Sequence, residues 1–205
     1  MIKLSRRNLL LGAAVIAVAS PALAAPAPDL SDLLTPPEGG DMTMGQDDAK
    51  VTLVEYASAS CPHCAAFAKD VFPKIKTDYV DTGKVKFIFR EFPHNQQALA
   101  AFMLARCLPK EKYFPLIDVF FATQDKWVPD AKEGLGNIAK QAGMSQADFD
   151  ACLKNESVAN SILAVREKAT TKYGVDSIPT LFLNGKVFHG ETTYDDLKKA
   201  IDPLL

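Results

Sequence analysis

The chain has 205 residues, of which 48% are hydrophobic and 23% charged, as in an ordinary globular protein with room for one sizeable core. Its formal net charge is −2. Once the basic residues of a predicted N-terminal export signal are set aside, 20 Lys and Arg face 25 Asp and Glu, and the charge is −5. A nucleic-acid-binding role, which needs a basic face, is therefore not expected.

Residues 1–24 have the pattern of a secretory signal peptide. Three basic residues precede an apolar run, Leu9 to Val18, and the small residues at 22–24 supply a cleavage point. The apolar run is short for a membrane span, so we favour cleavage over a retained anchor. The stretch "SRRNLLL" also resembles a twin-arginine export signal, and the export route stays open. Either route leaves the cytoplasm, and in a bacterium it leads to the oxidising periplasm, where disulfides persist.

Residues 25–40 are rich in proline, glycine and acidic side chains, which predicts a flexible leader with little capacity to pack. The folded domain is expected to fill residues 41–205. Its first clear element is the apolar, β-rich run 51–57, which predicts a strand, and helical periodicity follows over 65–80. Pro73 lies inside this helix and should kink it, because proline lacks the N–H and crowds the preceding turn.

The alternating run 83–92 predicts a second strand, parallel to the first because a helix connects them. From 95 to about 173 the patterns are almost all helical, which predicts an inserted helical subdomain. Period-2 alternation returns at 180–190 around the strong hairpin turn Asn184-Gly185, and a last helix follows at 194–202. This order of elements predicts an α/β fold of thioredoxin-like pattern, interrupted by the helical insertion.

Two cysteines three positions apart, Cys61 and Cys64, follow the first predicted strand in the stretch "SASCPHC". A cysteine in the first turn of a helix lies among unpaired backbone N–H groups at the positive end of the helix dipole, so the pKa of Cys61 should fall. Cys64 lies deeper and within bonding reach, which suits a resolving thiol. His63 can add a donor or a positive charge beside Cys61 and, with Pro62, favours an oxidising disulfide.

The same two cysteines could instead be ligands of a structural zinc site or form a purely structural disulfide. A zinc site needs four ligands, and Cys107 and Cys152 lie far along the chain. A disulfide across so short a ring constrains little chain entropy. We therefore favour redox chemistry, for which neither a metal nor an organic cofactor is needed.

Glu55 stands inside the first apolar strand, six positions before Cys61. Burying a carboxylate there costs free energy unless its pKa rises or it has a partner. We favour a buried Glu55 that meets one of these conditions. The alternative is a carboxylate at the edge of the sheet or facing the surface.

The other conspicuous side chains are given plainer roles. His94 and His189 are not expected to be ligands, and His94, which follows Pro93 in a predicted loop, should be solvated. Trp127 and the aromatic cluster at 113–121 predict the core of the insertion rather than a substrate platform.

The stretch "VTLVEYASASCPHC" and, some 115 residues later, "GVDSIPTLFLNGK" resemble the DsbA family of periplasmic thiol:disulfide oxidoreductases, in the branch with a second cysteine pair. The resemblance covers about residues 41–205. It implies that Pro179 is cis and faces the redox pair, that the backbone of Ile178 pairs with substrate, and that Glu55 transfers protons. A second acid that some relatives carry in the following helix is missing, since residues 65–68 are Ala, Ala, Phe and Ala.

The resemblance also implies a function and partners. The chain is expected to introduce disulfide bonds into reduced, unfolded exported proteins in the periplasm, with a quinone-linked membrane oxidase of the DsbB type as electron acceptor. We expect a monomer. An isomerase or reductase of the same fold stays open, as do a peptide-binding chaperone without turnover and a periplasmic metal-binding protein. A bond between Cys107 and Cys152 would close a loop of about 45 residues, and a structural disulfide is favoured there over a role in tuning the redox pair.

Overall fold

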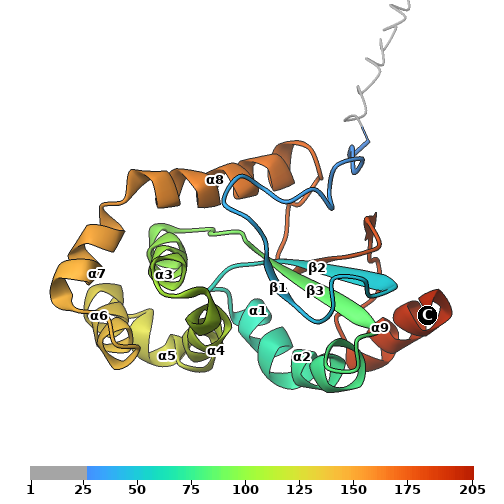
Figure 1. Ribbon diagram of the computed structural model, residues 1–205, viewed down its shortest axis with the longest axis horizontal. Coiled ribbons are helices and arrows are strands. Elements are labelled where there is room, and N and C mark those ends of the chain that lie inside the picture. The colour runs from blue at the N-terminus through green and yellow to red at the C-terminus, as the bar shows by residue number, and fades with distance from the viewer. Residues whose placement is uncertain (1–26) are drawn as a thin grey trace, which may run out of the picture.

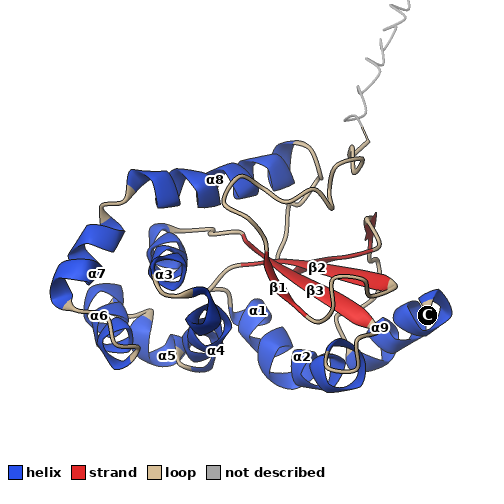
Figure 2. Ribbon diagram, viewed as in Figure 1, coloured by secondary structure: helices blue, strands red, loops and turns tan. Residues whose placement is uncertain are grey.

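The computed structural model describes residues 27–205, so the predicted signal peptide lies outside the described residues. A five-stranded sheet with the strand order β1-β3-β2-β4-β5 forms the centre of the fold (Figure 2). β2 and β3 pair in parallel, as predicted, and the other three pairs are antiparallel. The strands are β1 (Met42–Met44), β2 (Val51–Ala57), β3 (Val85–Glu91), β4 (Thr180–Leu183) and β5 (Lys186–Val187).

Helices cover both faces of the sheet and extend beyond one end of it (Figure 1). One face carries α1 (Pro62–Ala66), α2 (Phe72–Ile75) and α9 (Tyr194–Ile201), and the other carries α8 (Glu156–Thr171). The predicted α/β fold with a helical insertion is confirmed. Before α8 the insertion contains α3 (Gln96–Cys107), α4 (Tyr113–Ala122), α5 (Gln124–Trp127), α6 (Ala131–Gln141) and α7 (Gln146–Leu153).

The helix predicted over 65–80 is present but irregular, because π-helical turns at Phe67–Val71 and Lys76–Val80 alternate with α1 and α2. Pro73 lies in the first turn of α2. A π turn uses i to i+5 hydrogen bonds instead of the i to i+4 bonds of an α-helix. Proline has no N–H to donate, and a change of hydrogen-bond spacing around it accommodates the missing donor. The kink predicted at Pro73 therefore takes the form of wider turns on both sides of it.

The side chains of β2 alternate between two separate cores. Val54 and Tyr56 pack on the face that α8 covers. Leu53 and Ala57 belong to the core on the opposite face, together with the helix that follows β2. Because side chains two positions apart share a face of a strand, Glu55 points to the same side as Leu53 and Ala57. The buried carboxyl therefore faces the helix that carries the two cysteines.

The segment before β1 packs against the domain, contrary to the expectation of a flexible leader. Leu33 is fully buried in the core beneath α8. Arg90, at the end of β3, donates hydrogen bonds to the carbonyl oxygens of Leu33 at 2.6 Å and Thr35 at 3.2 Å, and to the carboxylate of Asp41 at 2.8 Å. The leader prediction was wrong because these partners come from elements far along the chain, which composition does not reveal.

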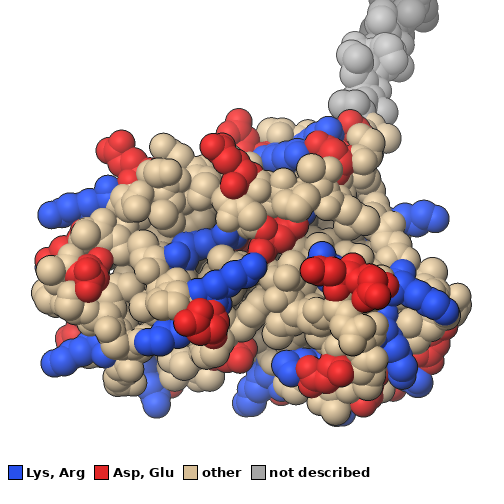
Figure 3. All heavy atoms as spheres, in the orientation of Figure 1, with Lys and Arg blue, Asp and Glu red and all other residues tan. Residues whose placement is uncertain are grey.

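Charges of both signs are interspersed on the face that Figure 3 shows. Exposed ion pairs such as Lys76–Asp81, at 2.7 Å, contribute little to stability because water screens them. Among residues 27–205, no helix combines the length and the hydropathy needed to cross a bilayer.

Candidate active site

Cys61 and Cys64 lie where the chain leaves β2 and enters α1. Cys61 is the residue just before the helix, with φ −85° and ψ 120°, and Pro62 opens the first turn. Proline suits this position because its missing N–H would have no helical partner there. Cys61 is 6% exposed, whereas Cys64 is fully buried. An attacking group can therefore reach only the first of the two sulfurs.

The two thiols differ sharply in acidity. A hydrogen bond from the Cys64 thiol, and further ones from the backbone N–H groups of Cys64 and His63, lower the pKa of Cys61 to about 5 against the opposing effect of burial. The same contact with Cys61 raises the pKa of Cys64, and burial and the charge of Glu55 raise it further. At neutral pH the reduced pair is thus a Cys61 thiolate beside a Cys64 thiol.

Glu55 is a buried carboxyl rather than an edge or surface group, since only 3% of the residue is exposed. Burial, and then the charge of Cys61, raise its pKa to about 8. Its Oε1 has no hydrogen-bond partner among the described residues. Glu55 lines a cavity of about 20 Å³ together with Phe72, Phe89 and Asp118, which is room for one water molecule.

The loop before β4 faces Cys61 from across the sheet. Its Ile178–Pro179 peptide bond is cis, and Cys61 Sγ lies 3.8 Å from the carbonyl oxygen of Ile178. Pro179 also borders a hollow of about 390 Å³, whose other side is formed by Phe188 and His189 after β5. The cis peptide bond therefore lies beside Cys61, and its proline also borders the hollow.

A family model described as Thioredoxin matches residues 38–203. The crystal structure of alpha-DsbA1 from Wolbachia pipientis superposes on the chain with a TM-score of 0.77 and 31% sequence identity, covering 85% of this chain and 95% of that one. The chain belongs to the DsbA family of thioredoxin-like proteins. The resemblance drawn from the two sequence motifs is thereby confirmed.

Two curated relatives of this DsbA-family chain carry names that refer to disulfide chemistry. A putative protein-disulfide oxidoreductase of Rickettsia bellii is 34% identical over 168 residues, which are 80% of this chain and 64% of that protein. Disulfide bond formation protein D of Bacillus subtilis is 29% identical over 175 residues, 81% of this chain and 78% of that protein. The chain spans about three fifths of the length of the first curated relatives it matches, 64% and 61%.

Two polar residues from other parts of this DsbA-family chain contact the redox loop and were not predicted. His94 is exposed, as expected, but its Nδ1 lies 2.8 Å from Ser58 Oγ, and its charge helps to lower the pKa of Cys61. The side-chain amide of Gln124 donates to the carbonyl oxygen of Cys61 at 3.0 Å. No local sequence pattern marks these residues, because each meets the loop only through the tertiary fold.

The second cysteine pair forms a disulfide, Cys107–Cys152, which joins the end of α3 to α7 within the insertion. Trp127, also in the insertion, is fully buried, as expected for a core residue. Its Nε1–H donates to the carbonyl oxygen of Phe120 at 2.8 Å. The disulfide and this aromatic core hold the helices of the insertion together, and no strand of the sheet comes from the insertion.

Removing the second disulfide by Cys107→Ala with Cys152→Ala should lower the free energy of unfolding by about 2 to 4 kcal/mol. The bond closes a loop across 45 positions, and opening it restores entropy to the unfolded chain. Urea unfolding followed by circular dichroism measures this difference. The matched control is Cys61→Ala with Cys64→Ala, compared with the wild type while this pair is reduced; these two cysteines are then free thiols that close no loop, so the change in stability should be smaller. An unchanged midpoint in the first variant would contradict the structural role.

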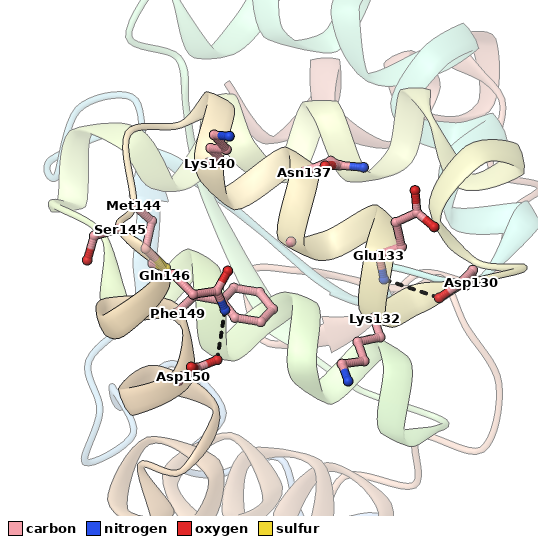
Figure 4. Close-up of a pocket in the computed structure, with 11 residues that line it drawn as sticks. Asp130, Lys132, Glu133, Asn137, Lys140, Met144, Ser145, Gln146, Phe149 and Asp150 are labelled. Carbon is pink, nitrogen blue, oxygen red and sulfur yellow. Dashed lines mark hydrogen bonds between the residues drawn. The ribbon is translucent and has the colours of Figure 1, made fainter.

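A separate hollow of about 590 Å³ lies between α6 and α7 (Figure 4). Two hydrogen bonds join residues that line it: Gln146 donates to Asp150 at 2.9 Å, and the Glu133 N–H donates to Asp130 at 3.1 Å. Neither cysteine of the redox pair lines it. Within residues 27–205, no group of three or more His, Cys, Asp and Glu side chains could hold a metal ion.

Proposed function

We propose that the chain is a thiol:disulfide oxidoreductase that introduces disulfide bonds into exported proteins through the Cys61–Cys64 pair. The observation that carries this proposal is the asymmetry of the pair: Cys61 lies at a helix start with a pKa of about 5, and Cys64 is buried with a raised pKa. A thiol of pKa about 5 instead of 9 favours the reduced protein at pH 7 by roughly 3 kcal/mol, or about 60 mV. The disulfide form should accordingly be oxidising.

The reaction consists of two thiol–disulfide exchanges. A substrate thiolate attacks Cys61 Sγ, the Cys61–Cys64 bond breaks, and Cys64 leaves while a substrate–Cys61 disulfide forms. A second substrate thiolate then attacks the substrate sulfur of this mixed disulfide, and Cys61 leaves as a thiolate. The substrate has lost two electrons and gained a disulfide, and the protein has gained two electrons and holds a Cys61 thiolate and a Cys64 thiol.

Glu55 supplies the proton that Cys64 needs when it leaves. With a pKa of about 8 the carboxyl is protonated at neutral pH, so it can donate to the departing sulfur and later recover the proton. The 20 Å³ cavity beside Glu55 has room for one water molecule that can hydrogen-bond to the carboxyl. No described residue competes for Oε1, which leaves it free for this role.

The backbone of Ile178 and Pro179 holds the substrate. The Ile178 carbonyl lies 3.8 Å from Cys61 Sγ, so an extended peptide whose cysteine is bonded to Cys61 passes directly beside it. The hollow next to Pro179 can take side chains of that peptide. Reduced, unfolded chains fit this requirement, because their segments are free to extend along this backbone.

The site of action and the recycling partner follow from the same chemistry. A signal peptide at residues 1–24 would send the chain to the periplasm, where a reduced oxidant must pass its electrons on. A quinone-linked membrane oxidase of the DsbB type would accept them. The exchange itself uses only the cysteines and Glu55 and requires no cofactor.

The reduction potential of the Cys61–Cys64 pair, equilibrated against glutathione, tests the proposal together with the oxidative refolding of a reduced model protein such as ribonuclease. We expect a potential above about −200 mV and accelerated refolding. A potential near −270 mV, typical of a thioredoxin-type reductant, would overturn the oxidase assignment. A peptide-binding chaperone would instead assist refolding equally well when both cysteines of the pair are replaced.

A further inference from the structure

The insertion makes a direct polar contact with the redox loop through Gln124, the first residue of α5. Its Nε2 donates one hydrogen bond to the carbonyl oxygen of Ala59, at 2.7 Å, and one to the carbonyl oxygen of Cys61, at 3.0 Å. The two carbonyls lie on either side of the Ser60–Cys61 backbone. The amide therefore links the carbonyl of Cys61 itself to the carbonyl of the residue two positions before it.

The short helix α5 is itself fixed within the insertion. Trp127 anchors it by being fully buried and by donating from Nε1 to the Phe120 carbonyl at 2.8 Å. Gln97 of α3 donates to the carbonyl of Val128, the residue after α5, at 3.3 Å. Gly134 of α6 packs so closely that a Cβ there would lie 2.5 Å from Trp127 Cα. Gln124 thus projects from an element that α3, α4 and α6 hold in place.

The position of the loop matters for the acidity of Cys61. Its sulfur receives hydrogen bonds from the Cys64 thiol and from the backbone N–H groups of Cys64 and His63, all of which belong to α1. The strength of such bonds falls steeply when donor and acceptor are misaligned. Cys61 joins the loop to α1, because its N–H donates to Ser58 at 3.0 Å and its carbonyl accepts from Ala65 at 3.1 Å. A shift of the loop carbonyls would turn the sulfur away from its donors.

We propose that Gln124 is a positioning residue that clamps the Ala59 and Cys61 carbonyls, keeps the Cys61 sulfur aligned with the α1 donors, and so lets the helical insertion set the redox potential of the pair. This inference rests on the proposed function and goes beyond it. It gives the insertion a role in the exchange chemistry besides covering the sheet. The residue touches neither the sulfur nor the substrate and acts through the loop backbone.

Two nearly isosteric variants test the clamp. Gln124→Leu removes both hydrogen bonds, and Gln124→Glu places carboxylate oxygens against the two carbonyls, which is repulsive. Both should raise the pKa of Cys61, and both should lower the equilibrium constant for oxidation of glutathione, by about 3- to 10-fold for leucine and by more for glutamate. The thiolate absorbance at 240 nm against pH, after selective reduction of the Cys61–Cys64 pair, gives the first quantity.

The matched control is Gln146→Leu, which removes a glutamine side-chain hydrogen bond to Asp150 in the same insertion but away from α5 and the loop. It should change the equilibrium constant less than twofold. Equal losses of stability in the oxidised and reduced forms of both Gln124 variants, with the pKa and the equilibrium constant unchanged, would overturn the proposal. These readouts require no protein substrate, so they can fail while the oxidase function holds, and they can succeed where it does not.

Discussion

Replacing Cys61 by serine should slow disulfide formation in a reduced substrate protein by roughly 10²- to 10⁴-fold, close to the uncatalysed rate. A hydroxyl cannot form the disulfide that substrate attacks. Cys64 cannot take over, because it is fully buried and its pKa is raised by its contact with Cys61, by burial and by the charge of Glu55. Oxidative refolding of reduced ribonuclease in a glutathione buffer measures the rate.

The matched variant, Cys64→Ser, should fail in a different way. It keeps the reachable sulfur but lacks the resolving thiol. In the same buffer, oxidised glutathione forms a disulfide with Cys61 and releases one glutathione, and a substrate thiolate then attacks Cys61 Sγ and displaces the second. The resulting mixed disulfide between Cys61 and the substrate should accumulate and be visible on a non-reducing gel. Cys61→Ser should give no such adduct. A Cys61→Ser protein that retains more than half of the wild-type rate, or a Cys64→Ser protein that forms no adduct, would contradict the assigned roles.

The elements around the redox pair could be predicted because their signals are local. β2 and β3 could be predicted from the apolar run 51–57 and the alternating run 83–92 alone. The hairpin turn could be predicted from Asn184-Gly185, and both residues adopt the positive φ that a tight hairpin turn requires. The helix start at Cys61 could likewise be predicted, because Cys61 follows a predicted strand and precedes a proline, which suits the first turn of a helix. For Glu55 the apolar strand favoured burial but left an edge or surface position open, and the fold decides for burial.

The parts that escaped prediction depend on partners far along the chain. β1 has only three residues and forms by pairing with β3, so its own pattern is too short to detect. Leu33 becomes a core residue because Arg90 binds the carbonyls around it, some 57 positions away. Gln124 reaches the Cys61 loop across 63 positions. Such contacts become visible only when the tertiary fold is known.

Replacing Glu55 by leucine should stabilise the protein increasingly as pH rises from about 4.5 to about 8. Its pKa in the fold is about 8 against 4.5 for an ordinary glutamate, chiefly because of burial. Below pH 4.5 the carboxyl is protonated in both states and contributes nothing that depends on pH. Between the two values the unfolded chain is ionised while the folded protein keeps its proton, so folding loses about 1.4 kcal/mol per pH unit in the wild type.

The difference in unfolding free energy between Glu55→Leu and the wild type should therefore grow by about 3 kcal/mol between pH 4.5 and 7, and level off near pH 8. Urea unfolding of the oxidised protein across this range measures this difference. The oxidised protein has no Cys61 thiolate, so burial, the larger cause of the raised pKa of Glu55, is then the cause that is tested. Glu55→Gln, which is also uncharged, should show the same pH dependence from a lower starting stability, since its amide is buried without a partner. The exposed Glu167→Gln serves as the control and should run parallel to the wild type. If the Glu55 variants also run parallel to the wild type, the carboxyl is ionised in the folded protein at neutral pH, and it cannot donate the proton that Cys64 needs on leaving.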